Sequence, residues 1–211
     1  MTVSGFTFNA FSENTYVLHD GTGQCVIIDP GCYEPAEQQA LQRFIAEQGL
    51  QVVLLLNTHC HIDHVLGNQF VLDTYQVPFL IHEADAGTLR SVSAYAPSYG
   101  FARYNPAEPT GFLTPDQPVQ FGNTELEVRF APGHAPGHVV FYHAPTGVVI
   151  GGDVLFQGSI GRTDLPGGDY ATLISSIHSQ LLTLHDDTVV YPGHGPATTV
   201  GAERRSNPFL N

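Results

Sequence analysis

The chain has 211 residues and a formal net charge of −13, and all seven of its permanent side-chain cations are arginines. A nucleic-acid partner requires a basic surface, so this charge argues against one. No apolar run approaches the roughly 18 residues of a membrane-spanning helix, and no basic segment followed by an apolar stretch opens the sequence.

The three cysteines, Cys25, Cys32 and Cys60, lack the spacing of a disulfide framework. Reduced thiols and a cytoplasmic location are therefore expected. Residues 1–211 are long enough to form one domain with a substantial core, and we expect a single domain. The sequence does not indicate the oligomeric state.

Apolar patterning predicts strands and helices in an interspersed order. In the first half we expect strands at Thr7–Ala10, Thr15–His19, Cys25–Asp29, Val52–Leu56 and Phe79–His82, with helices at Pro35–Gln48, Gly67–Tyr75 and Glu83 to about Ser93. In the second half we expect strands near 117–121, 124–131, 138–143, 147–152 and Thr188–Tyr191, with a helix at Tyr170–Leu182. This order favours an α/β fold of the αββα type, in which helices flank two mixed sheets.

The segment Ala94–Pro118 interrupts this order with five aromatic residues and five prolines. A long loop inside a compact domain is usually functional or disordered, and the aromatic content argues against disorder. Two interpretations remain open. The loop either walls a substrate pocket, with Tyr99 as a candidate substrate contact, or packs its rings onto the body of the protein.

The segment His59-Cys60-His61-Ile62-Asp63-His64 directly follows the buried run Val52–Leu56 and contains four metal-ligand side chains. Residues at this spacing do not share one helical face. They fit a loop that leaves a strand and enters a helix, at the sheet edge where α/β proteins bind ligands. Alternation points Cys60 away from its neighbours, so we expect it to pack in the core.

Three further strand ends each add one ligand residue: His134 in Pro132-Gly133-His134, Asp153 after Gly151-Gly152, and His194 in Pro192-Gly193-His194. Unrelated core histidines do not gather at four strand ends, so the pattern predicts a metal site. Neutral imidazole and carboxylate favour zinc, with iron or manganese as alternatives.

The seven side chains suffice for two ions, because each centre needs about three protein ligands. We expect one ion on His59, His61 and His134, and the other on Asp63, His64 and His194. Asp153 suits a bridging position, because its two oxygens can reach ions roughly 3.5–4 Å apart. A hydroxide shared by the two ions would be nucleophilic near neutral pH.

Three residues beside these motifs also have candidate roles. Asp29, at the end of a strand, either orients a ligand imidazole or forms the turn before Pro30. His138 is expected to support a ligand or contact substrate rather than bind metal. Arg162 follows Asp153, where its cation either meets a substrate carboxylate or thiolate or forms a structural salt bridge.

These motifs resemble the five-motif pattern of the metallo-β-lactamase-fold hydrolases, in Thr58–His64 together with His134, Asp153 and His194. Within that superfamily the chain is most similar to the glyoxalase II (hydroxyacylglutathione hydrolase) branch. The supporting segments are Pro132–His138, Gly152–Phe156, Gly158–Asp164, Tyr191–Pro196 and Ser206–Leu210. The resemblance extends from Asn14 to Leu210.

The resemblance implies hydrolysis of a small acyl-thiol, for example S-lactoylglutathione, at two metal ions. Asp63 would orient the attacking hydroxide or accept its proton. The presence of His64, and of no cysteine ligand, separates the chain from β-lactamases that use cysteine at the second metal. Glyoxalase II proteins also have a helical C-terminal domain whose basic residues bind glutathione. This chain has no lysine and stops at Asn211, so the thiol carrier and the acyl group stay open.

A second enzyme class also fits the resemblance. Persulfide dioxygenases share the fold and would hold a single iron on His59, His134 and Asp153, although the sequence after Asp153 is more similar to the hydrolases. Lactone, β-lactam or other ester hydrolysis would use the same site, and a metal-binding protein without catalysis is the remaining alternative.

Overall fold

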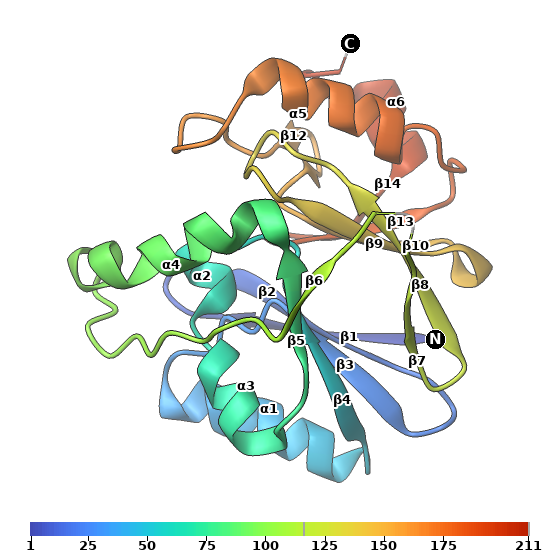
Figure 1. Ribbon diagram of the computed structural model, residues 1–211. Helices are drawn as coiled ribbons and strands as arrows, with labels where there is room; N and C mark the ends of the chain where they lie inside the picture. The colour runs from blue at the N-terminus through green and yellow to red at the C-terminus, as the bar shows by residue number, and fades with distance from the viewer. Residues whose placement is uncertain (116, 211) are drawn as a thin grey trace.

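A computed structural model describes residues 1–115 and 117–210. Two six-stranded sheets face each other, and helices cover the outer face of each sheet (Figure 1). The predicted αββα arrangement of two mixed sheets flanked by helices is confirmed. Residues 116 and 211, which fall in the predicted loop and at the end of the predicted domain, lie outside the described residues.

The first sheet has the strand order β1-β2-β3-β4-β5-β6. Its strands are β1 Thr2–Phe8, β2 Glu13–His19, β3 Gln24–Ile28, β4 Gln51–Leu56, β5 Phe79–His82 and β6 Gly111–Leu113. The first three strands are antiparallel, and β3 to β6 run parallel. Parallel strands end at the same edge of a sheet, so the loops after β3 and β4 lie close together.

The second sheet has the order β14-β13-β10-β9-β8-β7. Its strands are β7 Val119–Phe121, β8 Thr124–Phe130, β9 Val139–His143, β10 Val148–Gly152, β13 Val189–Pro192 and β14 Thr198–Thr199. Among the described strands of this sheet, β10 and β13 are the one parallel pair, so their following loops lie side by side. A separate short hairpin joins β11 Leu155–Phe156 to β12 Ser159–Ile160.

The helices form the outer layers (Figure 1). They are α1 Pro35–Glu47, α2 Ile62–Val65, α3 Asn68–Tyr75, α4 Ala86–Tyr95, α5 Tyr170–Ser176 and α6 Val200–Ser206. Helix α5 continues into a π-helical turn at Ile177–Leu181, and 3₁₀ turns occur at Glu83–Asp85, Ala96–Tyr99 and Ala144–Thr146. Among the described residues, no helix has the length and apolar character needed to cross a bilayer.

Three apolar layers hold the sandwich together, and β4 shows how the sequence builds them. Leu54 and Leu56 belong to the core between the sheets, whereas Leu55 belongs to the core beneath the helices of the first sheet. Alternate side chains point to opposite faces of a strand, so a continuous apolar run serves both layers. Burying one such leucine contributes about 1.5–3 kcal/mol. The strand end that carries the ligands is therefore firmly fixed.

The observed element bounds differ from the predictions in several places. Strand β1 ends at Phe8 rather than Ala10, because Asn9 adopts a left-handed conformation (φ 53°), and it begins at Thr2 because it pairs with β2 along its whole length. The segment Ala94–Pro118 was predicted to be irregular, but its described residues include the end of α4, a 3₁₀ turn and β6. Strand β14 and helix α6 were not predicted.

Candidate metal centre

The predicted ligands come from four chain segments at one edge of the sandwich, and two of them, Asp63 and His64, lie in the short helix α2. Strand β4 ends at Leu56, and the loop after it leads through His61, which lies directly before α2. Strands β10 and β13 end just before Asp153 and His194, and their parallel pairing brings these two residues together. His134 lies in the loop between β8 and β9. The predicted convergence of strand ends is therefore present.

The first group comprises His59, His61 and His134, whose ring nitrogens lie within 4.8 Å of one another. His61 Nδ1 is 2.8 Å from His134 Nε2, and His134 Nε2 is 3.2 Å from His59 Nε2. His59 and His134 are buried, and His61 lies at the opening of the group. Three imidazoles with converging nitrogens could hold one divalent ion.

The second group comprises Asp63, His64 and His194, whose ligand atoms also lie within 4.8 Å of one another. Asp63 Oδ2 is 3.0 Å from His194 Nε2 and 3.7 Å from His64 Nε2. His64 is fully buried, whereas Asp63 and His194 are partly exposed. This group could hold a second ion with one carboxylate and two imidazole ligands.

Asp153 faces both groups. Its Oδ1 is 3.5 Å from His64 Nε2, and its Oδ2 is 3.6 Å from His134 Nε2 and 3.5 Å from His194 Nε2. Both Asp153 Oδ1 and His64 Nε2 are buried and lack a hydrogen-bond partner. Buried polar atoms in proteins normally have hydrogen-bond partners. Two buried atoms that face each other without such partners fit a site in which both would bind a cation.

Hydrogen bonds on the far side of the rings fix the tautomers of three ligand histidines. His134 Nδ1 donates to the Arg162 carbonyl oxygen (2.8 Å), and His194 Nδ1 donates to the Phe11 carbonyl oxygen (3.2 Å). His64 Nδ1 lies 3.3 Å from the Asp29 carboxylate. Each Nε2 is left with a free lone pair directed into the centre.

Of the two alternatives left open for Asp29, its contacts favour the one in which it orients a ligand imidazole. Besides its contact with His64, it accepts hydrogen bonds from the Thr58 backbone (2.7 Å), the Thr58 hydroxyl (2.6 Å) and the Asn57 side chain (3.2 Å). A third group with ligand geometry, Asp29 with His59 and His64, shares two members with the groups above. Because Asp29 is already occupied by these donors, we assign it to orienting His64.

The electrostatics of the two groups differ. Burial lowers the pKa of His61 to about 3 and holds the pKa of His59 well below its ordinary value. Burial also disfavours the His64 imidazolium, but the carboxylates of Asp63 and Asp153 outweigh it and raise the His64 pKa. Burial acts to raise the Asp153 pKa, yet the facing imidazoles, His64 foremost, hold it below its ordinary value. Neutral imidazoles and ionised carboxylates are the forms that bind a divalent cation, so an ion in the second group would take the place of the proton that these carboxylates favour on His64.

Gly193 is required by close packing against the centre. A Cβ atom at this position would lie 2.2 Å from Asp153 Oδ1 and 2.7 Å from His64 Cε1. Any side chain would displace one of these two groups. The glycine before His194 therefore does more than open the turn.

A pocket of about 790 Å³ opens onto the centre. Its wall includes five of the seven predicted ligands, namely His61, Asp63, His134, Asp153 and His194. The wall also includes the apolar residues Phe11, Ile62, Tyr95, Tyr99, Phe156, Ile160, Leu165 and Pro166. A pocket with a mostly apolar wall and a few converging polar groups is typical of a small-molecule site.

Two of the three predicted substrate contacts lie in this wall. Tyr99 lines the pocket with about half of its surface exposed (54%). Arg162 also lines it, and its Nε and Nη2 donate to the two carboxylate oxygens of Asp164, each at 2.7 Å. The pocket position and the local ion pair that the sequence left as alternatives for Arg162 are thus both present.

The third, His138, lies behind the centre. It is fully buried, stacks on His59 with ring centroids 4.7 Å apart, and accepts a hydrogen bond from the Asp153 backbone (3.0 Å). This position supports the alternative in which His138 steadies a ligand, because His138 is not among the described residues that line the pocket.

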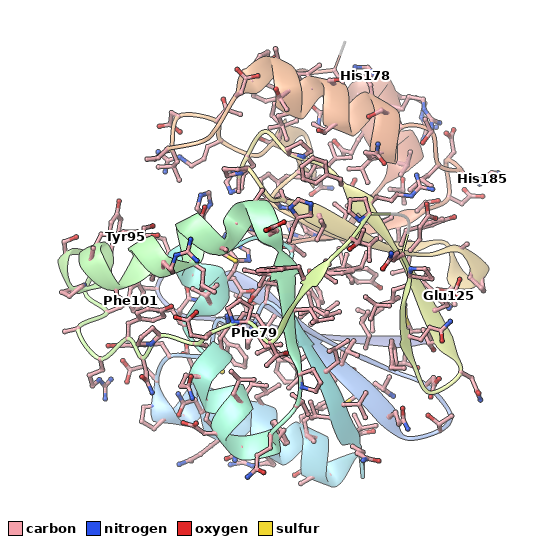
Figure 2. All side chains as sticks on the ribbon, in the orientation of Figure 1. Phe79, Tyr95, Phe101, Glu125, His178 and His185 are labelled. Atoms are coloured by element: carbon pink, nitrogen blue, oxygen red, sulfur yellow. The ribbon has the colours of Figure 1, made fainter. Side chains whose placement is uncertain are left out.

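Both interpretations of the aromatic segment apply, to different rings. Tyr95 and Tyr99 line the pocket, whereas Phe101 and Tyr104 pack into the core of the first sheet. Figure 2 shows Tyr95 and Phe101 on the same side of the molecule, on α4 and the segment that follows it. Phe11 also lines the pocket but was not predicted, because it follows a strand far from every ligand motif. Cys60 is fully buried in the core, as alternation predicted.

Fold and site together define a class of protein: an αββα sandwich with a two-part His/Asp metal site at one edge. The family model described as the metallo-beta-lactamase superfamily matches residues 9–194. The chain belongs to the metallo-β-lactamase superfamily, whose members are usually hydrolytic enzymes.

Two relatives indicate the branches nearby. A protein of Bacillus subtilis described as probable metallo-hydrolase YqgX is 41% identical over 89% of this chain and 88% of its own length. A protein of Haemophilus influenzae described as hydroxyacylglutathione hydrolase GloC is 38% identical over 100% of this chain and 99% of its own length.

Three solved structures have the same fold. BLEG-1, described as a B3 metallo-beta-lactamase, has a TM-score of 0.91 and 35% identity, with complete coverage of both chains. TTHA1623 in a di-iron-bound form has a TM-score of 0.89 and 38% identity over 99% of this chain and 100% of its own. ETHE1 from Myxococcus xanthus has a TM-score of 0.81 and 25% identity over 99% of this chain and 84% of its own.

Proposed function

We propose that this protein is a dinuclear metal hydrolase that cleaves the thioester bond of a small acyl-thiol, such as S-lactoylglutathione. The observation that carries the proposal is Asp153, whose two oxygens face both ligand groups at the floor of an open pocket. The full-length similarity to GloC supports a thioester substrate.

The residues present fit two ions. His59, His61 and His134 would hold one, Asp63, His64 and His194 the other, and Asp153 would serve both. Bound divalent ions supply a Lewis acid for the carbonyl and lower the pKa of a bound water to near neutrality. We propose zinc, which suits these ligands, while the di-iron form of TTHA1623 supports iron as the alternative, and manganese stays open.

The chain's own groups would carry the rest of the chemistry. Asp63 lines the pocket, and its carboxylate can accept a proton from the attacking water. Tyr99 and Arg162 would hold the substrate against the pocket wall. The departing thiol has an ordinary pKa of about 8.5, so it leaves as a thiolate without a dedicated acid.

A second candidate is a persulfide dioxygenase with one iron on His59, His134 and Asp153. Similarity to ETHE1 from Myxococcus xanthus favours this candidate. The second ligand group argues for the hydrolase, because a single-iron enzyme needs neither Asp63 nor His194 as a ligand. The similarity to BLEG-1 supports comparing a β-lactam as a substrate of the same site. A lactone and another ester would be compared in the same way.

The test compares wild-type protein with His194→Ala on two substrates. We expect wild type to release thiol from S-lactoylglutathione, to lose this activity with a chelator and regain it with metal, and to lose it in His194→Ala. Oxygen uptake on glutathione persulfide that survives His194→Ala, without thioester cleavage by either protein, would contradict the hydrolase and support the dioxygenase.

A further inference from the structure

One partly buried hairpin tip contacts all three members of the second ligand group. It is the tip of the β1–β2 hairpin, residues Asn9–Asn14, which belongs to the first sheet at the start of the chain (blue in Figure 1). No ligand motif predicted from the sequence lies within it. Its contacts reach helix α2, which carries Asp63 and His64, the loop after β3, and the loop after β13, which carries His194.

The first contact is to the backbone of Asp63 in helix α2. The Asn9 side-chain amide donates to the Asp63 carbonyl oxygen and to the Gly31 carbonyl oxygen, both at 3.0 Å. Asn9 also fixes the shape of the tip, because its side-chain oxygen accepts a hydrogen bond from the Phe11 backbone (2.9 Å). Asn9 and Ser12 both have left-handed backbones (φ 53° and 56°), a conformation in which asparagine is tolerated.

The second contact is to His64. Glu13 is fully buried, and its Oε1 lies 3.8 Å from His64 Nδ1, on the side of the ring that faces away from the centre. The Glu13 carboxyl therefore stands behind the ring that Asp29 also orients.

The third contact is to His194, 180 positions along the chain. The Asn14 side-chain amide donates to the carbonyl oxygens of Pro192 (3.1 Å) and Gly195 (2.8 Å), which flank His194. The Asn14 backbone donates to the Gly193 carbonyl oxygen (2.7 Å), and the Phe11 carbonyl oxygen accepts from His194 Nδ1 (3.2 Å). The loop that holds His194 is thus bound to the hairpin tip on both sides.

The first ligand group has different supports. His134 is held by the Arg162 carbonyl oxygen, and His59 Nδ1 lies 3.1 Å from the Thr58 hydroxyl. Within residues 1–115 and 117–210, no hydrogen bond, ion pair or ring contact joins the hairpin tip to His59, His61 or His134.

We propose that the β1–β2 hairpin tip positions the second metal centre, with Asn9 and Asn14 as its positioning residues, and that the first centre does not depend on it. The inference rests on the two-ion assignment of the proposed function. Groups that hold metal ligands from behind typically change metal affinity by about 10–100-fold when removed. The loss should therefore fall on one ion of two.

The experiment titrates metal-free protein with zinc in competition with a chromophoric chelator, for wild type, Asn9→Ala and Asn14→Ala. The matched control is Asn207→Ala. Asn207 is buried, as Asn14 is, and its side-chain amide also donates two hydrogen bonds, to the Ser159 carbonyl oxygen and to Glu203, neither of which is a predicted ligand.

We expect wild type and the control to bind two ions with unchanged affinities. In Asn14→Ala, the ion of the second ligand group should bind about 10–100-fold more weakly, while the affinity for the ion of the first group is unchanged. If Asn14→Ala does not fold, Asn9→Ala should show the same result. Equal weakening of both ions, or full retention of both, overturns the inference while leaving the dinuclear assignment intact. Binding of a single ion by wild type overturns the dinuclear assignment itself, and the inference with it.

Discussion

The substitution Asp153→Ala tests the link between the two ligand groups. Asp153 is 7% exposed, and its carboxylate faces His64 with one oxygen and His134 and His194 with the other. Removing it takes a negative charge from both groups in one step. We therefore expect both ions to bind more weakly together. His61→Ala should weaken only the ion of the first group.

The size of the effect follows from burial. Removing one partner from a buried charged arrangement costs about 3–5 kcal/mol. Since 1.4 kcal/mol corresponds to a tenfold change in affinity, each ion should bind about 10²–10⁴-fold more weakly. Thioester hydrolysis should fall accordingly at limiting metal concentration.

The assay is metal content after dialysis against a chelator of intermediate strength, followed by a zinc titration. Glu203→Gln is the control, because Glu203 is also a buried carboxylate but is held by Thr198, Gly158 and Asn207 rather than by ligands. Two tightly bound ions in Asp153→Ala would refute the bridging role. Loss of one ion alone would assign Asp153 to a single centre.

Three further perturbations test other parts of the structure. Asp20→Asn should lower the free energy of unfolding at pH 7, because hydrogen bonds, led by that from Thr22, lower the Asp20 pKa to about 2. The stabilisation by the carboxylate is present above its unfolded pKa of about 3.9 and is lost as the pH falls towards 2. A stability advantage of wild type over the variant in urea unfolding that does not shrink across this pH range would contradict the prediction. Asp164→Asn should release Arg162 and lower the KM for an anionic thioester up to about fivefold, with kcat unchanged, because an exposed ion pair contributes a free energy of this scale. Steady-state kinetics that show no change in KM would assign the ion pair a purely structural role. Leu126→Ala, in the core between the sheets, should reduce the unfolding free energy by about 2–5 kcal/mol while both metal ions are retained. A loss of metal from the folded variant would count against separate roles for the core and the metal site.

The fold was largely predictable where hydrophobic patterning is strong. The helix expected at Pro35–Gln48 is observed at Pro35–Glu47, and the strand expected at Phe79–His82 has those bounds. Helix α6 was missed because it has seven residues, includes Gly201 and precedes Pro208, so it carries little helical signal. Its beginning is set by the Thr199 side chain, which accepts a hydrogen bond from Ala202.

The candidate ligands were predictable because each ligand segment follows an apolar run, and His134, Asp153 and His194 also follow a glycine or proline turn. Parallel pairing then brings loops distant in sequence to one edge, as for Asp153 and His194. The residues that hold the ligands in place from behind were harder to predict from the sequence. Nothing near Asn14 in the sequence indicates a contact with residues 192–195, because that contact depends on how the two sheets face each other.

The number of ions needed for activity tests the central claim most directly. Metal-free protein would be titrated with zinc while the hydrolysis of S-lactoylglutathione is followed on the same sample. The dinuclear account predicts that activity rises until about two equivalents are bound, in line with two ligand groups that share Asp153. Full hydrolytic activity at one equivalent, or no hydrolysis at two, would contradict it.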